Sequence, residues 1–121
     1  MPIPQKKINN LKISIILPNY NSSKYIDATI KSIINQSFKN WELIIIDDCS
    51  DEKTKKILSK YLKNKKIKII WLKRNRGAGY CRNLAIKKSK SKYLAFIDSD
   101  DLWEKNKLKI EFEYMVKNNY S

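Results

Sequence analysis

Histidine is absent from this chain of 121 residues, and cysteine occurs only twice. The absence of histidine excludes catalysis by a histidine base and the zinc sites that use histidine. Cys49 and Cys81 do not form a Cys-x-x-Cys pair, so a cysteine zinc site is excluded as well. The sequence leaves a disulfide between them open, but a cytoplasmic protein favours two free thiols, because such proteins seldom keep disulfides.

Glycine is also scarce, and its two positions exclude two nucleotide-binding motifs. A Gly-x-Gly-x-x-Gly turn should follow the first strand, but the loop at 18–23 contains no glycine. A Walker-type Gly-Lys-Ser/Thr loop is absent too. Gly77 and Gly79 follow the third apolar stretch instead, where we expect them to allow positive φ or a close backbone approach.

Long hydrophobic runs are missing. No apolar run approaches the roughly 20 residues that span a bilayer, and residues 1–7 lack the apolar centre of a signal peptide. Apolar residues make up 42% of the chain, which is typical of a globular protein. We therefore expect a cytoplasmic protein with a polar lead-in at 1–11 and one domain at 12–121.

Acidic residues are outnumbered, with 12 Asp and Glu against 26 Lys and Arg, which gives a net charge of +14. Such a charge attracts polyanions, including nucleic acid and anionic membrane surfaces. No nucleic-acid-binding module accompanies the charge, so we expect no specific nucleic-acid partner. Peripheral association with an anionic membrane, at its inner face, remains an open expectation.

Four apolar stretches alternate with four amphipathic patterns. The expected strands are 12–17, 41–46, 67–72 and 93–97, the last of them buried. A helix follows each strand; the first carries Ile26, Ile30, Ile33 and Ile34 on one face. We expect Ser22 or Ser23 to cap this helix and Asp51 to cap the next one. The second helix has an apolar side, formed by Ile57, Leu58, Tyr61 and Leu62. The order βαβαβαβα predicts an α/β fold whose parallel sheet is covered by helices on both faces.

Half of the acids cluster after two of these strands: Asp47, Asp48, Asp51, Asp98, Asp100 and Asp101. The segment after the third strand adds Lys73, Arg74 and Arg76, with Arg82 one turn into the next helix. In a parallel sheet these loops share one edge. Carboxylates suit a hard cation and guanidinium groups suit phosphates, so a nucleoside diphosphate with a divalent metal would match this edge.

The three acids at 98–101 also have a structural interpretation, as turn formers and a helix cap. Capping requires only one such residue, however. Three crowded carboxylates repel one another unless a positive charge lies among them, and this favours a metal site.

Four motifs, in this order, resemble family 2 glycosyltransferases of the GT-A fold. They are Ile-Ile-Leu-Pro-Asn-Tyr-Asn at 15–21, the segment 32–51, Gly77 through Asn83, and Phe-Ile-Asp-Ser-Asp-Asp at 96–101. The resemblance covers nearly the whole chain from Ile13 on. It is to the amino-terminal, nucleotide-sugar-binding half of the domain, with a Rossmann-like parallel sheet.

The resemblance implies a metal site at the acidic motif. Asp98 and Asp100 match the ends of the family's Asp-x-Asp motif and are the implied metal residues. Asp100 would ligate Mn²⁺ or Mg²⁺, and Asp98 would hold the ribose or the water shell of the metal. Asp101 is the implied catalytic residue, which orients the site or meets the sugar.

The resemblance also implies a nucleotide pocket. Its residues would be Pro18, Tyr20, Asn21, Asp48, Gly77, Arg82, Asp98 and Ser99. Asp48 would accept the imide N–H of the base, Tyr20 would stack on the base, and Arg82 would pair with phosphate. Tyr20 as a core residue, Arg82 as a surface residue and Asp47 as a turn acid are the alternative readings. Lys73, Arg74 and Arg76 are weaker candidates, since solvated basic loops are common.

The implied function is inverting transfer of a sugar from a nucleoside-diphosphate donor, most often a UDP-sugar, to a hydroxyl of a glycan or lipid-linked acceptor. Family members carry the general base and the acceptor site in a later half, so we expect a truncated domain with little turnover alone. Two alternatives stay open: a non-catalytic nucleotide-binding fragment, and a basic module for nucleic acid or membrane. A phospho-receiver domain would leave the loops at 18–21 and 77–79 without a role.

Overall fold

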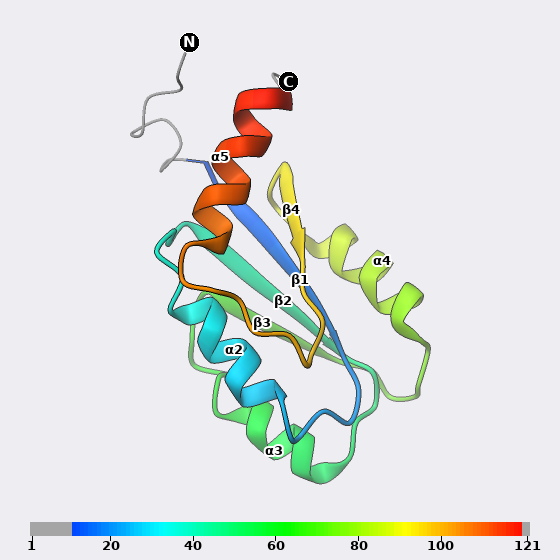
Figure 1. The fold of residues 1–121 in the computed structure, drawn as a ribbon. Helices are drawn as coiled ribbons and strands as arrows, with labels where there is room; N and C mark the ends of the chain where they lie inside the picture. The colour runs from blue at the N-terminus through cyan, green and yellow to red at the C-terminus, as the bar shows by residue number, and fades with distance from the viewer. Residues whose placement is uncertain (1–10, 120–121) are drawn as a thin grey trace.

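The computed structural model describes residues 11–119, which form one sheet with helices on both faces (Figure 1). The predicted lead-in at 1–11 therefore lies almost wholly outside the described residues. The elements, in chain order, are β1 Ile13–Asn19, α2 Ile26–Ile34, β2 Trp41–Asp47, α3 Glu52–Ser59, β3 Ile67–Trp71, α4 Ala78–Lys88, β4 Tyr93–Phe96 and α5 Lys107–Asn119.

The four strands form a parallel sheet in the order β3-β2-β1-β4. In the register, Ile13 lies opposite Trp41 of β2 and opposite Tyr93 of β4. This arrangement confirms the predicted α/β fold. It also brings the carboxyl ends of all four strands to one edge, as the sequence pattern required.

The core has two layers because β1 and β2 are buried on both faces. Side chains such as Ile15, Leu17 and Leu43 form the larger layer with α2, α3 and α5. On the other face, Ile16 and Ile44 belong to a second cluster with Cys81 and Ala85 of α4. A continuous apolar run in each central strand is what burial on two faces requires.

The prediction that the fourth strand is buried is wrong. β4 forms an edge of the sheet beside β1, and Phe96 is 52% exposed. Phe96 pairs in register with Ile16 and so shares the face of the sheet that α4 covers, but α4 packs against β1 and β2. An apolar run cannot reveal whether a helix covers it, because this depends on where the neighbouring helix lies.

Two predictions about helix boundaries are wrong, and one is confirmed. Neither Ser22 nor Ser23 caps α2: Tyr25 precedes its first residue without a side-chain cap, and the Ser22 hydroxyl donates to Asn19. Leu62, placed on the apolar side of the next helix, is 56% exposed because α3 ends at Ser59. Asp51 does cap α3, and its carboxylate accepts the Thr54 N–H at 2.9 Å.

Within residues 11–119, no helix combines the length and the apolar character that crossing a membrane requires. The longest helix, α5, spans 13 residues and carries Lys107, Lys109, Glu111, Glu113 and Lys117. Its apolar side packs through Leu108 and Phe112 onto the sheet, where the Phe112 ring lies 5.0 Å from that of Tyr93.

Candidate functional site

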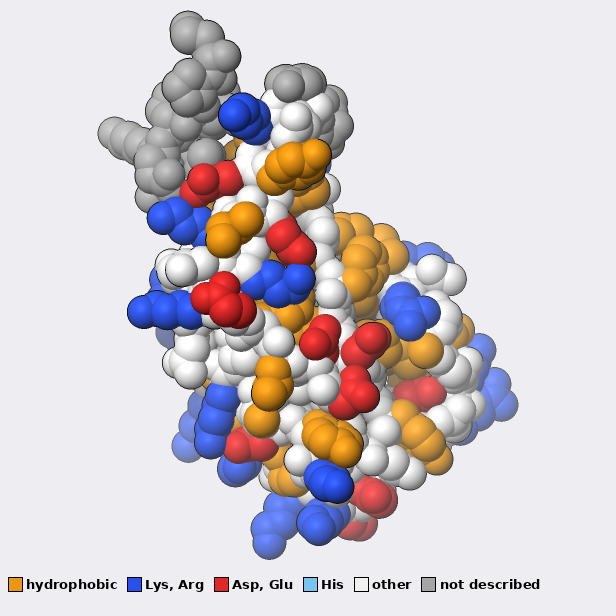
Figure 2. Space-filling model, viewed as in Figure 1, with side chains coloured by type: hydrophobic (Ala, Val, Ile, Leu, Met, Phe, Trp, Pro, Cys, Tyr) orange, Lys and Arg blue, Asp and Glu red, His pale blue; other side chains and the backbone are white. Residues whose placement is uncertain are grey.

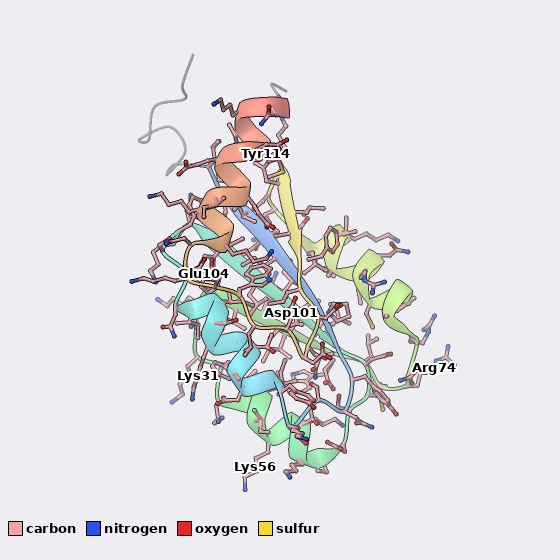
Figure 3. All side chains as sticks on the ribbon, in the orientation of Figure 1. Lys31, Lys56, Arg74, Asp101, Glu104 and Tyr114 are labelled. Carbon is pink, nitrogen blue, oxygen red and sulfur yellow. The ribbon has the colours of Figure 1, made fainter. Side chains whose placement is uncertain are left out.

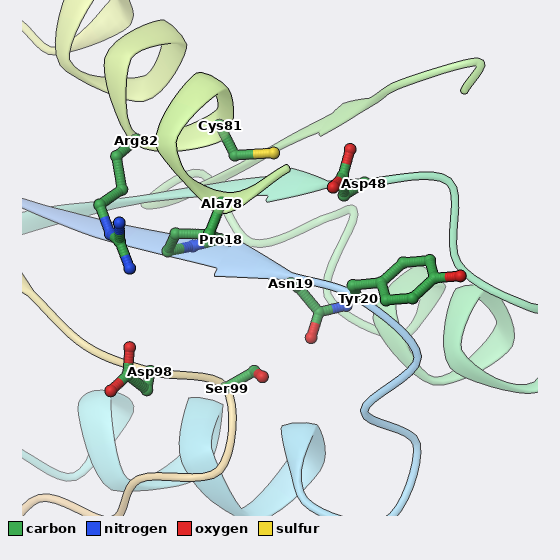
Figure 4. Close-up of a pocket in the computed structure, with 9 residues that line it drawn as sticks. All are labelled: Pro18, Asn19, Tyr20, Asp48, Ala78, Cys81, Arg82, Asp98 and Ser99. Atoms are coloured by element: carbon green, nitrogen blue, oxygen red, sulfur yellow. The ribbon is translucent and has the colours of Figure 1, made fainter. Parts of the chain in front are cut away.

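The carboxyl edge of the sheet carries an open pocket of about 220 Å³ (Figure 4). Its lining comes from four separate parts of the chain: the end of β1, the residue after β2, the first turns of α4 and the residues after β4. These lining residues are Pro18, Asn19, Tyr20, Asp48, Ala78, Cys81, Arg82, Asp98 and Ser99. Asp98 and Ser99 lie across the pocket from Pro18, Ala78 and Arg82 (Figure 4).

Six residues that the sequence singled out line this pocket: Pro18, Tyr20, Asp48, Arg82, Asp98 and Ser99. Three lining residues were not predicted. Asn19 lies within the predicted loop motif, so its position was a usable signal. Ala78 and Cys81 lie in the first turns of α4. Ala78 is four residues before Arg82 and three before Cys81, and because residues three and four apart share a helix face, the spacing from Arg82 could have indicated Ala78 but not Cys81.

A buried polar network fixes the loops after β1 and β2. The Asp47 carboxylate is fully buried and accepts hydrogen bonds from Asn19 Nδ2 at 3.0 Å, from Ser50 Oγ at 2.6 Å and from the Ser50 N–H at 3.1 Å. Asn19 in turn accepts from the hydroxyl of Ser22. Because a buried carboxylate is costly without such donors, this network holds the two loops in one arrangement.

Asn21 belongs to this connection between loops and does not line the pocket. Its N–H donates to Ser50 Oγ at 2.9 Å, and its Oδ1 accepts the Asp51 N–H at 2.7 Å. Asn21 and Cys49 both have positive φ, at 47° and 64°. The network thus holds each loop in a conformation that few residue types adopt, and it leaves Tyr20 exposed at the pocket mouth.

The Asp48 carboxylate anchors the loop before α4. It is 4% exposed, and its two oxygens accept the N–H groups of Arg76 at 2.6 Å and Gly77 at 2.9 Å. Gly77 has a φ of +91°, which confirms the predicted positive φ. Gly79 lies inside α4 without positive φ, so the predicted positive φ is wrong at that position, and a Cβ there would meet no atom of the described chain within 4 Å.

Gly77 contributes to the site through its backbone and does not line the pocket. The basic side chains of the same loop, Lys73, Arg74 and Arg76, are exposed. Arg76 lies over the Tyr80 ring at 4.1 Å, and Arg74 points outward (Figure 3). Arg82 is therefore the basic side chain that the described structure brings to the pocket.

The acidic motif forms a tight turn, closed by the Asp101 N–H donating to the Asp98 carbonyl at 3.0 Å. Asp98, Asp100 and Asp101 are all exposed, and none forms an ion pair with a described residue. Figure 2 shows acidic side chains gathered over this part of the molecule. In the described part of the chain, no three Asp, Glu or Cys side chains converge into a ready cation site.

Cys81 is a buried thiol at the floor of the pocket. Burial, together with the nearby Asp48 and Asp47 carboxylates, raises the pKa of the Cys81 thiol to about 11.

Because the thiolate is the reactive form, we expect Cys81 to react on the order of 100-fold more slowly at pH 8 than an ordinary thiol. Thiol-labelling kinetics of Cys49→Ser and Cys81→Ser variants would measure this. Labelling of Cys81 as fast as in the urea-unfolded chain would contradict it.

The comparisons with known proteins agree on one family. The family model for glycosyl transferase family 2 matches residues 14–121. The chain is 42% identical over 106 residues to a putative teichuronic acid biosynthesis glycosyltransferase, TuaG, from Bacillus subtilis, covering 87% of this chain and 42% of that protein. It is 40% identical over 110 residues to the glucosyltransferase WfgD of Escherichia coli, covering 90% and 43% of the two chains.

A solved structure gives the same result. A crystal structure of TarS from Staphylococcus aureus in complex with UDP superposes with a TM-score of 0.82 at 35% identity, covering 90% of this chain and 33% of that one. The chain thus spans less than half the length of each of these relatives, and its fold is that of the GT-A domain of TarS. With a family model that matches almost all of its length, the chain belongs to glycosyl transferase family 2.

Proposed function

We propose that this chain is the donor-binding part of a glycosyltransferase and that its pocket holds a nucleoside-diphosphate sugar with a divalent metal. The observation that carries the proposal is that Asp48, Arg82 and Asp98 meet in one pocket from three separate parts of the chain: the loop after β2, helix α4 and the turn after β4. A nucleoside diphosphate combines a base and a ribose, which can donate hydrogen bonds to carboxylates, with a diphosphate, which pairs with a guanidinium group. UDP is the proposed nucleotide, because TarS structures that are 35% identical hold UDP and UDP-GlcNAc.

In this proposal, Pro18, Tyr20 and Asp48 receive the base. Tyr20 supplies an exposed aromatic face, and Asp48 supplies carboxylate oxygens that can accept an imide N–H. Each carboxylate oxygen has two lone pairs, so Asp48 can accept from a base while it anchors Arg76 and Gly77. Arg82 pairs with the diphosphate from α4.

The acidic turn fits a Mn²⁺ or Mg²⁺ ion. Asp98 and Asp100 offer hard oxygen donors, and their exposure leaves them free of competing ion pairs with the described residues. Because no three side chains converge there, diphosphate oxygens and water would complete the coordination shell. The bound ion would neutralise the charge that develops on the departing nucleoside diphosphate. Asp101 would orient the sugar.

We propose that the transfer is inverting and that the acceptor is a hydroxyl of a glycan or lipid-linked substrate. WfgD is named for an acceptor linked to diphosphoundecaprenol, and TarS for poly(ribitol-phosphate). An acceptor that carries phosphate would match the net charge of +14 and would place the protein at the inner face of an anionic membrane. No residue among 11–119 is proposed as the general base.

A titration with UDP tests the proposal. We expect Mn²⁺ to strengthen UDP binding to the wild-type chain about tenfold or more, because it screens the repulsion between the acidic turn and the diphosphate. Asp100→Ala should lose this gain, whereas Glu52→Ala, which removes an exposed acid on α3, should keep it. Calorimetry with and without Mn²⁺ measures both.

Two outcomes would reject the proposal. The first is a folded chain that does not bind UDP at millimolar concentration. The second is UDP binding to the wild-type chain that Mn²⁺ does not strengthen, because the proposal includes the metal. Sugar transfer has to be tested on a longer chain that adds the later half of the domain. Metal-dependent binding without transfer by that longer chain, in the presence of acceptor, would favour the second candidate, a non-catalytic nucleotide-binding fragment.

A further inference from the structure

The segment between β4 and α5 carries the acidic turn but contains no helix or strand. Its backbone N–H and C=O groups still need partners, because the segment lies against the body of the protein. Figure 3 marks Asp101 and Glu104 along this segment, beside α2. Helix α2 supplies several of these partners.

One stripe of polar side chains on α2 and just beyond it supplies these partners. Thr29, Ser32 and Gln36 are spaced by three and four residues, so they share a helix face. Thr29 and Gln36 are fully buried. They lie beside the apolar stripe of Ile26, Ile30 and Ile33, and they make contact with residues about 70 positions later in the chain.

Thr29 holds the acidic turn itself. Its hydroxyl lies 3.0 Å from the Ser99 carbonyl oxygen and 2.8 Å from the Asp101 carbonyl oxygen, so its single hydrogen is shared between them. These two carbonyls flank Asp100. A threonine inside a helix usually bonds back to the carbonyl one turn earlier, and here the hydroxyl reaches across to a distant segment instead.

Ser32 and Gln36 hold the rest of the segment. Ser32 Oγ accepts the Trp103 N–H at 3.2 Å. Gln36 donates through Nε2 to the Glu104 carbonyl at 2.7 Å and accepts the Leu108 N–H through Oε1 at 2.9 Å. These contacts lie at residues 103–108, which follow the acids at 98–101 and lead into α5.

We propose that Thr29 is a positioning residue for metal-dependent donor binding, which rests on the proposed function. By holding the carbonyls of Ser99 and Asp101, its hydroxyl sets the direction in which the Asp100 side chain leaves the turn. The three acids repel one another and have no cationic partner among the described residues. The turn therefore needs hydrogen bonds from another element to keep its conformation. Thr29 on α2 supplies these hydrogen bonds.

Thr29→Val tests the role, because valine keeps the shape of threonine and replaces the hydroxyl with a methyl group, which cannot form the hydrogen bonds. We expect the gain in UDP affinity on adding Mn²⁺ to fall about fivefold, the effect of one neutral hydrogen bond. UDP affinity without metal should stay within twofold of wild type, since the base contacts are untouched. Thr29→Ser, which restores the hydroxyl, should recover the gain.

Gln36→Met provides the matched control. It removes another buried polar group that ties the same segment to α2, and it should lower thermal stability while leaving the Mn²⁺ gain intact. If Mn²⁺ strengthened UDP binding to Thr29→Val as much as to the wild-type chain, the role of Thr29 would be overturned, whereas the proposed function would stand. The role of Thr29 would also be overturned if Thr29→Val bound UDP more weakly by the same factor with and without Mn²⁺, since that would indicate a general structural role. A wild-type chain without any Mn²⁺ gain would overturn the proposed function, and this role with it.

Discussion

Replacing Asp47 with alanine should lower the free energy of unfolding by about 3 kcal/mol, because each buried hydrogen-bonding group left unpaired costs about 1–3 kcal/mol. The change removes the acceptor for Asn19 Nδ2, for Ser50 Oγ and for the Ser50 N–H. These donors are buried, so water does not readily replace the lost carboxylate. Urea unfolding followed by circular dichroism would measure the loss.

Glu111→Ala is the control for this experiment. Glu111 also accepts a close hydrogen bond, from Lys107 at 2.8 Å, but its side chain is 58% exposed. Its loss should cost less than about 0.5 kcal/mol, as is usual for exposed pairs. If Asp47→Ala and Glu111→Ala were equally mild, the loops after β1 and β2 would have another source of order and the network would not be their main support.

Replacing Asp48 with alanine should weaken UDP binding about 30-fold or more, since charge-assisted hydrogen bonds contribute about 1.5–3 kcal/mol each. The effect has two parts. The pocket loses its acceptor for the base, and the N–H groups of Arg76 and Gly77 lose their anchor, which frees the loop before α4. Calorimetry would measure the affinity.

Hydrogen exchange at the amides of Arg76 and Gly77 would separate the two parts. We expect both amides to exchange faster in Asp48→Ala and also in Asp48→Asn, whose side chain keeps only one acceptor oxygen. Glu52→Ala, which removes an exposed acid from the next helix, should leave affinity and exchange unchanged. Wild-type affinity in Asp48→Ala would remove this residue from the proposed donor site.

Much of the architecture was predictable because strands that are buried on both faces have few polar positions. The run from Leu43 to Ile46 and the spacing of Ile26, Ile30 and Ile33 each identify their element directly. The edge position of β4 was not predictable in the same way. Tyr93 to Ile97 is as apolar as a central strand, and only the packing of α4 on β1 and β2 leaves Phe96 uncovered.

The candidate site shows the same division. The rule that ligands bind at the carboxyl ends of parallel strands identified Asp48, Arg82 and Asp98 as neighbours from the sequence alone. It could not identify residues that act by holding backbone. Thr29 lies on α2, whose apolar spacing indicates a core helix. The family motifs did name Asn21 and Gly77, but as pocket residues, whereas in the structure they contribute through loop conformation. Such roles depend on contacts between segments 29–72 residues apart, which no local pattern contains.

The edge position of β4 has a consequence for the behaviour of this chain in solution. The side of β4 away from β1 presents a row of backbone donors and acceptors, with the exposed ring of Phe96 beside it, and such an edge can recruit a strand from another molecule. The strand is only four residues long, however, and charged Lys92 and Asp98 stand close to its ends. Because short edges with flanking charges discourage intermolecular pairing, we expect Lys92 and Asp98 to limit strand pairing between molecules.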